Sequence, residues 1–346
     1  MFAPPGPPSP REPPVPPVSP ASVGSPAGPP HTFLIESEPA DDNGVENWGM
    51  RLKARETELI DSSDLVGDPG ALRDRIAGDG YVFVRGLLDP EGIRSVGRRG
   101  LRHLQAAGWT EDGFDPVAAP PSGSVRAVRM RDAFGDPGYQ RVLADPGFNA
   151  IPFVSPLAEL MGQILGPSAF CYPLKVPRIV YPITRAPHQP GNVVHKDYRS
   201  VQDMFTSWVP LGEVPRTLGG LAVRPGSQRT ARVRHRALDR LEPGWVTTDY
   251  LPGDVLVFHC LTTHAALPNL EGRMRFSAEY RWQLADQPAP RRVTVGPRGH
   301  EFGSRLFGRT DWWHSVTGGL TLFDDGGAGG APTLPAPPSR FVSFTN

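Results

Sequence analysis

The segment that decides how this chain folds, and what it can bind, is Asn192-Val193-Val194-His195-Lys196-Asp197-Tyr198. Successive side chains of a β-strand point to opposite faces of the sheet. If residues 193–198 form a strand, His195 and Asp197 share one face and Lys196 points to the other. A neutral imidazole and a carboxylate that converge on one point can bind a divalent metal. The segment therefore predicts β-structure that presents two metal ligands together.

A second segment supplies a third ligand. Residues 251–258 read as a turn followed by an apolar strand, and His264 lies just beyond the end of that strand. Two histidines and one carboxylate around open coordination positions are typical of non-haem Fe(II) oxygenases. Arg275 follows His264 by 11 residues, and we expect it on the neighbouring strand, facing the same cavity. Its planar guanidinium suits bidentate binding of a carboxylate.

Strand-like segments fill the second half of the sequence. They are short, and turn sequences such as Pro225-Gly226-Ser227 separate them. We expect strands at Leu174–Tyr181, Val193–Tyr198, Phe205–Leu211, Gly220–Arg224, Asp254–His259 and Phe276–Leu284. Several short strands punctuated by turns are typical of an antiparallel sandwich or jelly roll. The expected fold class is α+β, mainly β.

Helix-like segments precede these strands. Asp68-Pro69 begins a helical run that ends at Gly78 to Gly80, and Tyr81–Val84 reads as a short strand. Asp89 has the pattern of a helix N-cap, because proline follows it at the first helical position. Helices before and strands after predict that the helices pack on one face of the sheet.

Composition excludes several classes of protein. Acidic and basic residues number 36 each, so the chain lacks the basic excess of a general nucleic-acid binder. No apolar run approaches the roughly 18 residues of a membrane span. Cys171 and Cys260 are the only cysteines, which are too few for a disulfide framework and indicate a reducing compartment. We expect a cytoplasmic protein with neither nucleic-acid nor membrane partners.

Proline and glycine usage sets the expected domain boundaries. Residues 1–30 contain 13 of the 42 prolines, which predicts a disordered, proline-rich tail over residues 1–40. Residues 324–346 begin with a run rich in glycine, alanine and proline and are expected to form a flexible C-terminal tail. A single domain is expected over residues 41–323.

The order of these motifs resembles that of the phytanoyl-CoA dioxygenase family of Fe(II)/2-oxoglutarate oxygenases. The resemblance covers residues 78–284 and depends on order and spacing rather than on any one motif. The matching segments are, in chain order, Gly80–Pro90, His195–Tyr198, Ser207–Leu211, Gly219-Gly220-Leu221, Pro225-Gly226-Ser227, Pro252-Gly253-Asp254, His264, Pro268-Asn269 and Arg275-Phe276-Ser277. The resemblance implies a double-stranded β-helix, which is a cupin-like jelly roll.

The resemblance also implies roles for individual residues. His195, Asp197 and His264 match the iron ligands, which implies Fe(II) as cofactor with 2-oxoglutarate and O2 as cosubstrates. Arg275 matches the residue that binds the distal carboxylate of 2-oxoglutarate. The other cofactor-binding candidates are Trp208 and Ser277, which match residues lining the same pocket, and Lys175, a looser candidate on an early core strand.

The reaction that the resemblance implies is hydroxylation. Related halogenases have Gly or Ala in place of the carboxylate, which leaves room for chloride, whereas this chain has Asp197. We expect a dioxygenase that hydroxylates an unactivated C–H bond of a small organic substrate, as in secondary-metabolite tailoring, with succinate and CO2 as coproducts. The arginine-rich segment from Arg224 to Arg240 raises the alternative of a coenzyme A or carrier-protein thioester, whose phosphate it would contact.

Two other classes of protein fit some of the same residues. A cupin-like metal enzyme could use the three ligands without 2-oxoglutarate, but it would not need the carboxylate anchor at Arg275. A non-catalytic jelly-roll binding module would need neither ligands nor anchor. His259 also lies near His264 in sequence, but the alternation of its strand places it with Val255 and Val257, which favours a structural role. The segment from Gly296 to Thr317, with Trp312 and Trp313, fits no family pattern.

Overall fold

The computed structural model describes residues 57–123, 133, 135–186, 193–197, 204–230, 236–287, 289–290 and 322–323. The chain divides into two units, Met1–Gly49 and Met50–Asn346, and every described residue belongs to the second. The tails expected at 1–40 and 324–346, and the segment from Gly296 to Thr317, lie outside the described residues. The single domain over residues 41–323 stays a prediction.

The described residues contain both helices and strands. The α-helices are α1 (Pro69–Asp79), α2 (Pro90–Gln105), α4 (Pro137–Ala144), α5 (Pro146–Ala150) and α6 (Ser155–Leu165). The strands are β1 (Tyr81–Val84), β2 (Ala169–Cys171), β3 (Val176–Val180), β4 (Phe205–Pro210), β5 (Leu221–Val223), β6 (Val255–His259), β7 (His264–Ala266), β8 (Arg275–Leu284), β9 (Ala289–Pro290) and β10 (Leu322–Phe323). Short 3-10 turns are η2 (Ser63–Leu65), η3 (Ile151–Phe153), η6 (Arg216–Leu218) and η7 (Ser227–Arg229). No helix in the described ranges is long and apolar enough to cross a membrane.

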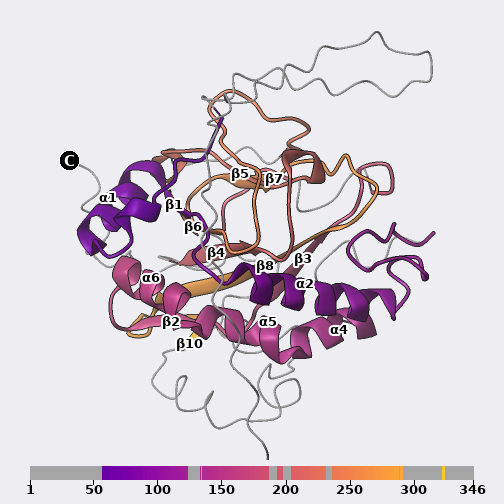
Figure 1. Ribbon diagram of the computed structural model, residues 1–346. Helices are drawn as coiled ribbons and strands as arrows, with labels where there is room; N and C mark the ends of the chain where they lie inside the picture. Colours follow the sequence, from indigo (N-terminus) through magenta and orange to yellow (C-terminus); the bar gives the residue numbers. More distant parts are fainter. Residues whose placement is uncertain are drawn as a thin grey trace, which may run out of the picture. The chain divides into compact units, whose positions relative to one another are not determined.

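Two antiparallel sheets form the β-structure around the site. The larger sheet has the strand order β1-β6-β4-β8-β2. Strand β2 pairs with the end of β8, from Trp282 to Leu284, and β3 pairs with its beginning, from Arg275 to Glu279. The smaller sheet pairs β5 with β7, and isolated bridges extend it from His195 to His264 and from Val223 to Val246. Figure 1 shows β5 and β7 on one side of β4 and β8, with helices on the other side. The arrangement confirms the expected jelly roll with helices packed on one face.

Small residues let the helical layer approach the larger sheet closely. A Cβ atom on Gly97 of α2 would lie 1.7 Å from the backbone oxygen of Leu211, and one on Gly100 would lie 2.5 Å from the Phe276 ring. No larger residue fits at either position without moving the helix. These two glycines therefore set the distance between α2 and the sheet.

Four of the helices begin with the same Asp-Pro pair, because aspartate caps the free N–H groups and proline suits the first turn. The Asp89 carboxylate accepts from the backbone N–H groups of Glu91 and Gly92, as predicted. Asp68 caps α1 in the same way, also as predicted. Asp136 and Asp145 cap α4 and α5, two helices that the sequence analysis did not predict.

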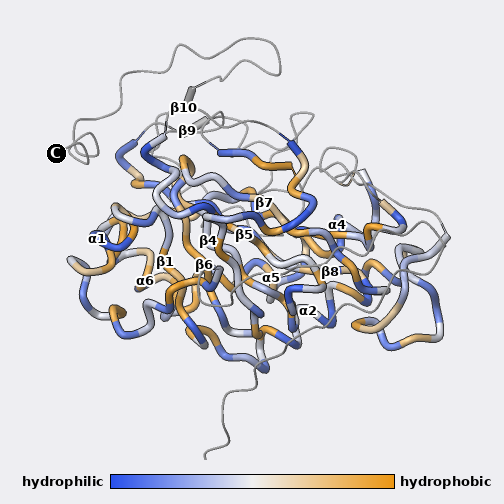
Figure 2. Tube along the Cα trace, turned by 90° about the horizontal axis from the view of Figure 1, so that it is seen from above, coloured by the Kyte–Doolittle hydropathy of each residue, from blue (hydrophilic) through white to orange (hydrophobic). Residues whose placement is uncertain are grey.

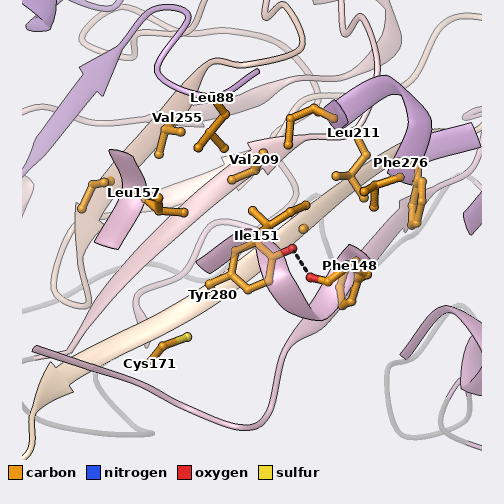
Figure 3. Close-up of a cluster of buried hydrophobic side chains, with 14 of the residues drawn as sticks. Leu88, Phe148, Ile151, Leu157, Cys171, Val209, Leu211, Val255, Phe276 and Tyr280 are labelled. Carbon is orange, nitrogen blue, oxygen red and sulfur yellow. Dashed lines mark hydrogen bonds between the residues drawn. The ribbon is translucent and has the colours of Figure 1, made fainter. Parts of the chain in front are cut away.

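The two faces of the larger sheet belong to different cores. The outer face packs under the helices, and the inner face lines the interior between the two sheets. In β8, the side chains of Phe276, Ala278, Tyr280 and Trp282 belong to the core under the helices. Figure 3 shows part of this core, where the Tyr280 hydroxyl donates to the backbone oxygen of Phe148 at 2.9 Å. A second core lies on the inner side and includes Tyr81, Phe83, Trp208, Leu256 and Phe258. Figure 2 shows hydrophobic segments along the strands and hydrophilic segments in many connecting loops.

Six of the seven expected strands are present. Tyr81–Val84 is β1, and the other five are β3, β4, β5, β6 and β8, each within two residues of its expected bounds. The exception is the segment expected at Val193–Tyr198. In its described part, Val194 N–H donates to Arg236, His195 N–H to His264, and Asp197 N–H to Cys260. The first of these hydrogen bonds goes to the segment of Arg236 and the other two go to the stretch 260–264. The pairings are isolated bridges, so residues 193–197 do not form one continuous strand.

Candidate metal centre

His195, Asp197 and His264 converge on one point inside the fold. One ligand atom from each residue lies within 4.8 Å of the other two. The Nε2 atom of His195 is 3.8 Å from Oδ1 of Asp197, and the two imidazole centroids are 4.2 Å apart. The histidines are bridge partners, because each backbone N–H donates to the carbonyl oxygen of the other, at 3.1 and 3.0 Å. The structure thus brings together the three ligands proposed from the sequence.

Both histidines are held in the tautomer that a metal ligand needs. Nδ1 of His195 lies 2.7 Å from the carbonyl oxygen of Val193, and Nδ1 of His264 lies 2.9 Å from that of Thr262. A carbonyl oxygen only accepts hydrogen bonds, so Nδ1 has the proton of the neutral ring. The lone pair on each Nε2 is therefore available to a metal, an arrangement common among metal-binding histidines.

Electrostatics keep His195 and Asp197 deprotonated. Burial lowers the pKa of His195 to about 4, and the neighbouring His264 acts in the same direction. Burial alone would raise the pKa of Asp197, but Arg281 and the two histidines outweigh it and bring that pKa to about 2. Divalent metals bind neutral imidazole and ionised carboxylate. His195 and Asp197 therefore have the required protonation states at neutral pH.

Asp197 stands at one end of a series of buried charges. Its Oδ2 atom lies 4.0 Å from Nη2 of Arg281, and the same Nη2 lies 3.7 Å from Oε2 of Glu279. Arg178 on β3 holds both oxygens of Glu279 at 2.7 Å. Burial acts to raise the pKa of Glu279, and Arg178 outweighs it, so the pKa is lowered. The series turns Oδ2 of Asp197 toward Arg281 and leaves Oδ1 facing His195.

Arg275 lies at the beginning of β8 on the same inner face. Its side chain is buried, and among the described residues it donates one hydrogen bond, to Ser277 Oγ at 3.3 Å. The guanidinium carbon is 5.6 Å from the ring centroid of Trp208. No carboxylate of the described residues forms an ion pair with it within 4.0 Å, and burial lowers its pKa to about 10. The charge of Glu279 opposes this shift but does not outweigh it. A buried cation without an ion-pair partner is costly unless a ligand supplies the anion.

Unsatisfied polar atoms gather on this inner face. Eight side-chain atoms of the described residues are buried without hydrogen-bond partners, and Thr206 Oγ1, Trp208 Nε1, Arg275 Nε and Arg281 Nε are among them. Thr206 and Trp208 on β4 lie opposite Arg281 and Glu279 on β8, so these donors share one surface. Each unpaired buried donor costs about 1–3 kcal/mol, and a group of them indicates a polar ligand. The donor set fits an anion rich in oxygen atoms, and the triad beside it fits Fe(II).

Lys175 is not brought to this surface. Its ammonium lies 5.2 Å from the ring centroid of Phe153 in the helical layer. Val176, the next residue, pairs with Glu279 and shares its inner face, so alternation turns Lys175 the other way. This placement does not favour the expected role of Lys175 in cofactor binding. Trp208 and Ser277, in contrast, both lie against Arg275.

Two other expectations concern residues near the site. The His259 ring packs on Phe205, with 5.0 Å between centroids, on the outer face that the strand alternation predicted. In the arginine-rich segment, Arg229 donates to the carbonyl oxygens of Ala77 and Gly78, and Arg236 pairs with Glu242. Residues 231–235 lie outside the described residues. The described part of this segment gives no support to a thioester substrate.

Sequence reasoning missed the buried charges Arg178, Glu279 and Arg281. A signal for two of them was present, because β8 alternates Arg, Ser, Glu, Arg and Gln with Phe, Ala, Tyr and Trp. A strand with one apolar face and one charged face, buried on both, implies that the charged face lines a polar interior. Arg178 had no comparable signal, because its partner Glu279 is distant in sequence.

A jelly roll that presents two histidines and a carboxylate beside a buried, unpaired arginine defines the class of non-haem, metal-dependent oxygenases. The family model for phytanoyl-CoA dioxygenase (PhyH) matches residues 76–277, which is more than half of the chain. The chain belongs to this family, as the resemblance implied, and is an Fe(II)/2-oxoglutarate-dependent dioxygenase with O2 as cosubstrate.

Several known proteins are similar to this chain. The 1-deoxypentalenic acid 11-beta-hydroxylase of Streptomyces arenae is 27% identical over 257 residues, covering 66% of this chain and 86% of the relative. The enzyme of that name from Streptomyces exfoliatus is 27% identical over 265 residues, with the same coverage. Among solved structures, EctD from S. alaskensis in its apoform has a TM-score of 0.45 at 16% identity, covering 79% of this chain and 92% of its own. Structural likeness at this level adds nothing to the family assignment.

Proposed function

We propose that this dioxygenase hydroxylates an unactivated C–H bond of a small organic substrate while 2-oxoglutarate is converted to succinate and CO2. The observation that supports this most strongly is the triad together with the unpaired guanidinium of Arg275. The triad alone would also fit a cupin-like enzyme that uses no cosubstrate. A buried arginine without a carboxylate partner in the described part of the chain favours a ligand that brings its own carboxylate.

In this proposal each residue has a distinct task. His195 and His264 hold Fe(II) through Nε2, and Asp197 holds it through Oδ1. The iron, when bound, supplies O2 activation, with one oxygen atom entering the substrate and the other entering succinate. Arg275 binds the distal carboxylate of 2-oxoglutarate.

The surroundings of the triad suit a reaction that must exclude water. The Phe258 ring lies 4.6 Å from the His264 ring, centroid to centroid, and Trp208 and Tyr250 pack at 4.7 Å in the same inner core. Both aromatic contacts are buried. An apolar surround protects reactive intermediates from side reactions and strengthens the charge interactions within it.

Two features support hydroxylation of a small organic substrate. The relatives named as hydroxylases act on 1-deoxypentalenic acid by name, which supports a tailoring reaction on a small molecule. Asp197 occupies the position that a halogenase would leave free for chloride.

The test is anaerobic addition of Fe(II) and then 2-oxoglutarate to the metal-free protein, followed by visible absorption. Chelation of 2-oxoglutarate by iron in such a site gives a weak charge-transfer band, and no substrate need be known. The band should appear in the wild type and in His259→Gln, and it should be absent in His195→Ala. His259→Gln is the matched control, because His259 lies close to the site in sequence but on the outer face of β6.

The possible outcomes separate the three classes of protein. Iron binding without the band would replace the proposal by a cupin-like enzyme that uses no 2-oxoglutarate. No iron binding at all would favour a binding module. If the band forms, the consumption of 2-oxoglutarate in air can be measured against candidate small molecules, and stoichiometric succinate with a hydroxylated product would identify the substrate.

A further inference from the structure

The residue between the two ligands of the first segment has an unusual environment. Lys196 points away from the triad, as the alternation predicted, and its side chain is buried with 4% of the residue exposed. Its ammonium donates to the carbonyl oxygens of Ser227 and Thr230, both at 2.6 Å, and lies 3.3 Å from the hydroxyl of Thr230. Three donors on one nitrogen thus meet three oxygens of Ser227 and Thr230, at the start of the turn η7 and just after its end.

The same turn also holds the segment of the third ligand. The hydroxyl of Ser227 accepts from the backbone N–H of Thr263 at 2.8 Å, and Thr263 immediately precedes His264. The N–H of Arg224, three residues before Ser227, donates to the carbonyl oxygen of Thr263 at 2.9 Å. The turn therefore contacts both ligand-bearing segments from outside, one through Lys196 and one through Thr263.

Lysine is rare in this chain compared with arginine, so the lysine at position 196 calls for a specific reason. Lysine occurs only three times in the chain, at Lys53, Lys175 and Lys196, whereas arginine occurs 33 times. The two lysines within the described residues are both buried. An ammonium is compact and directs three donors from one atom, whereas a guanidinium is planar, larger and spreads its donors over a fork. The three oxygens of Ser227 and Thr230 converge on one point, which matches an ammonium and not a guanidinium.

We infer that Lys196 is a positioning residue for the metal site. Through Ser227 it fixes the segment of His195 and Asp197 against the segment of His264 before any metal binds. The triad atoms lie within 4.8 Å of one another, which is the arrangement that this tether would hold. Lys196 touches neither metal nor substrate, so it acts only through the placement of the ligands. The inference rests on the proposed role of the triad in binding Fe(II).

The test is titration of the metal-free protein with Co(II), a spectroscopic substitute for Fe(II), followed by its visible absorption bands. Lys196→Met and Lys196→Arg should each weaken Co(II) binding by about 10-fold to 100-fold, the usual effect of losing a residue that orients metal ligands. Ser227→Ala, which keeps the backbone oxygen that Lys196 contacts, should have a smaller effect. The effects of Lys196→Met and Ser227→Ala should be less than additive in the double variant, because both act through one turn.

Gln228→Ala is the matched control. Gln228 lies in the same turn, but its side-chain amide donates to the carbonyl oxygens of Ala77 and Gly78 at the end of α1. It should lower the melting temperature of the metal-free protein while leaving Co(II) affinity within about twofold of wild type. A Lys196→Met variant that behaves like Gln228→Ala, with lower melting temperature and unchanged affinity, would overturn the inference.

Two further outcomes of the Co(II) titration test different parts of the inference. Wild-type affinity in Lys196→Arg would also overturn the inference, because any long cation would then suffice. A wild type that binds no Co(II) would refute the metal site itself, and the proposed function together with the inference. If Lys196→Met does not fold, Lys196→Arg and Ser227→Ala provide the same comparison against Gln228→Ala.

Discussion

Replacement of Arg275 by methionine should change two properties in opposite directions. Arg275→Met should weaken the binding of 2-oxoglutarate and at the same time stabilise the protein that has no ligand. The reason is that the guanidinium is buried and, among the described residues, has only the Ser277 hydroxyl as a hydrogen-bond partner. Such a group is unfavourable until an anion reaches it.

The loss of affinity can be worked from the hydrogen bonds that a carboxylate would accept. A hydrogen bond to a charged group contributes about 1.5–3 kcal/mol, and a bidentate pair makes two of them. A loss of about 3 kcal/mol or more corresponds to at least about a 100-fold rise in the dissociation constant, since about 1.4 kcal/mol is tenfold. Titration of the anaerobic iron complex with 2-oxoglutarate, followed by its charge-transfer band, measures this directly.

The gain in stability follows from the cost of burial. Burial lowers the pKa of Arg275 to about 10, a shift that corresponds to about 3 kcal/mol against the charged form. Methionine removes that cost and keeps an apolar chain against Trp208. We expect Arg275→Met to raise the free energy of unfolding of the metal-free protein by about 1–3 kcal/mol in urea denaturation.

Arg273→Met is the control for both measurements. Arg273 lies two residues earlier on the approach to β8, but it is partly exposed and pairs with Glu271 at 3.0 Å. An exposed pair of this kind contributes about 0–1 kcal/mol, so stability and 2-oxoglutarate affinity should both stay close to wild type. Wild-type affinity of Arg275→Met for 2-oxoglutarate would refute the role of Arg275 as carboxylate anchor. Destabilisation of the ligand-free protein by Arg275→Met would refute the cost assigned to burying the guanidinium.

Three further predictions follow from other parts of the structure. Asp197→Ala should weaken Co(II) binding by more than about 100-fold, measured by the same titration as above, and near-normal affinity would remove Asp197 from the ligand set. Gly97→Ala should destabilise the fold by about 3 kcal/mol or more, because its Cβ would lie 1.7 Å from a backbone oxygen. Gly78→Ala is the control, because its Cβ meets nothing within 4 Å, and it should be neutral or slightly stabilising. Equal free energies of unfolding for the two variants in urea denaturation would contradict this prediction. Burial acts to raise the pKa of Asp145, but hydrogen bonds from Arg99 and from the start of α5 outweigh burial and lower that pKa. The contribution of the Asp145 carboxylate to the free energy of unfolding is therefore fully present above the pKa of the unfolded state. It is lost as the pH falls through the pKa of the folded state. Asp145→Asn should therefore cost about 1 kcal/mol at pH 7 and progressively less below pH 3.8, and a difference that did not shrink in acid would contradict this account.

Most strands and the capped helices were predictable because their signals are local. The apolar alternation of β4, β6 and β8 depends on neighbouring residues, and so do the Asp-Pro starts of α1 and α2. The same Asp-Pro signal before α4 and α5 was present and was not used. The expected strand at Val193–Tyr198 was only partly correct, since the hydrogen bonds of a strand depend on partners elsewhere in the chain. Here those partners, at Arg236 and in the stretch 260–264, make only isolated bridges.

The sequence by itself determined the residue types and spacing of the candidate ligands, including the two that share a side around Lys196. Only the tertiary structure decided which distant groups meet them. His195 and His264 are 69 residues apart in sequence, yet they are direct bridge partners. The charges of Arg178 and Glu279, the tether from Lys196 to η7, and the turning of Lys175 into the helical layer have the same origin. Each depends on the register between segments remote in sequence, and that register is set by packing of whole faces rather than by any local pattern.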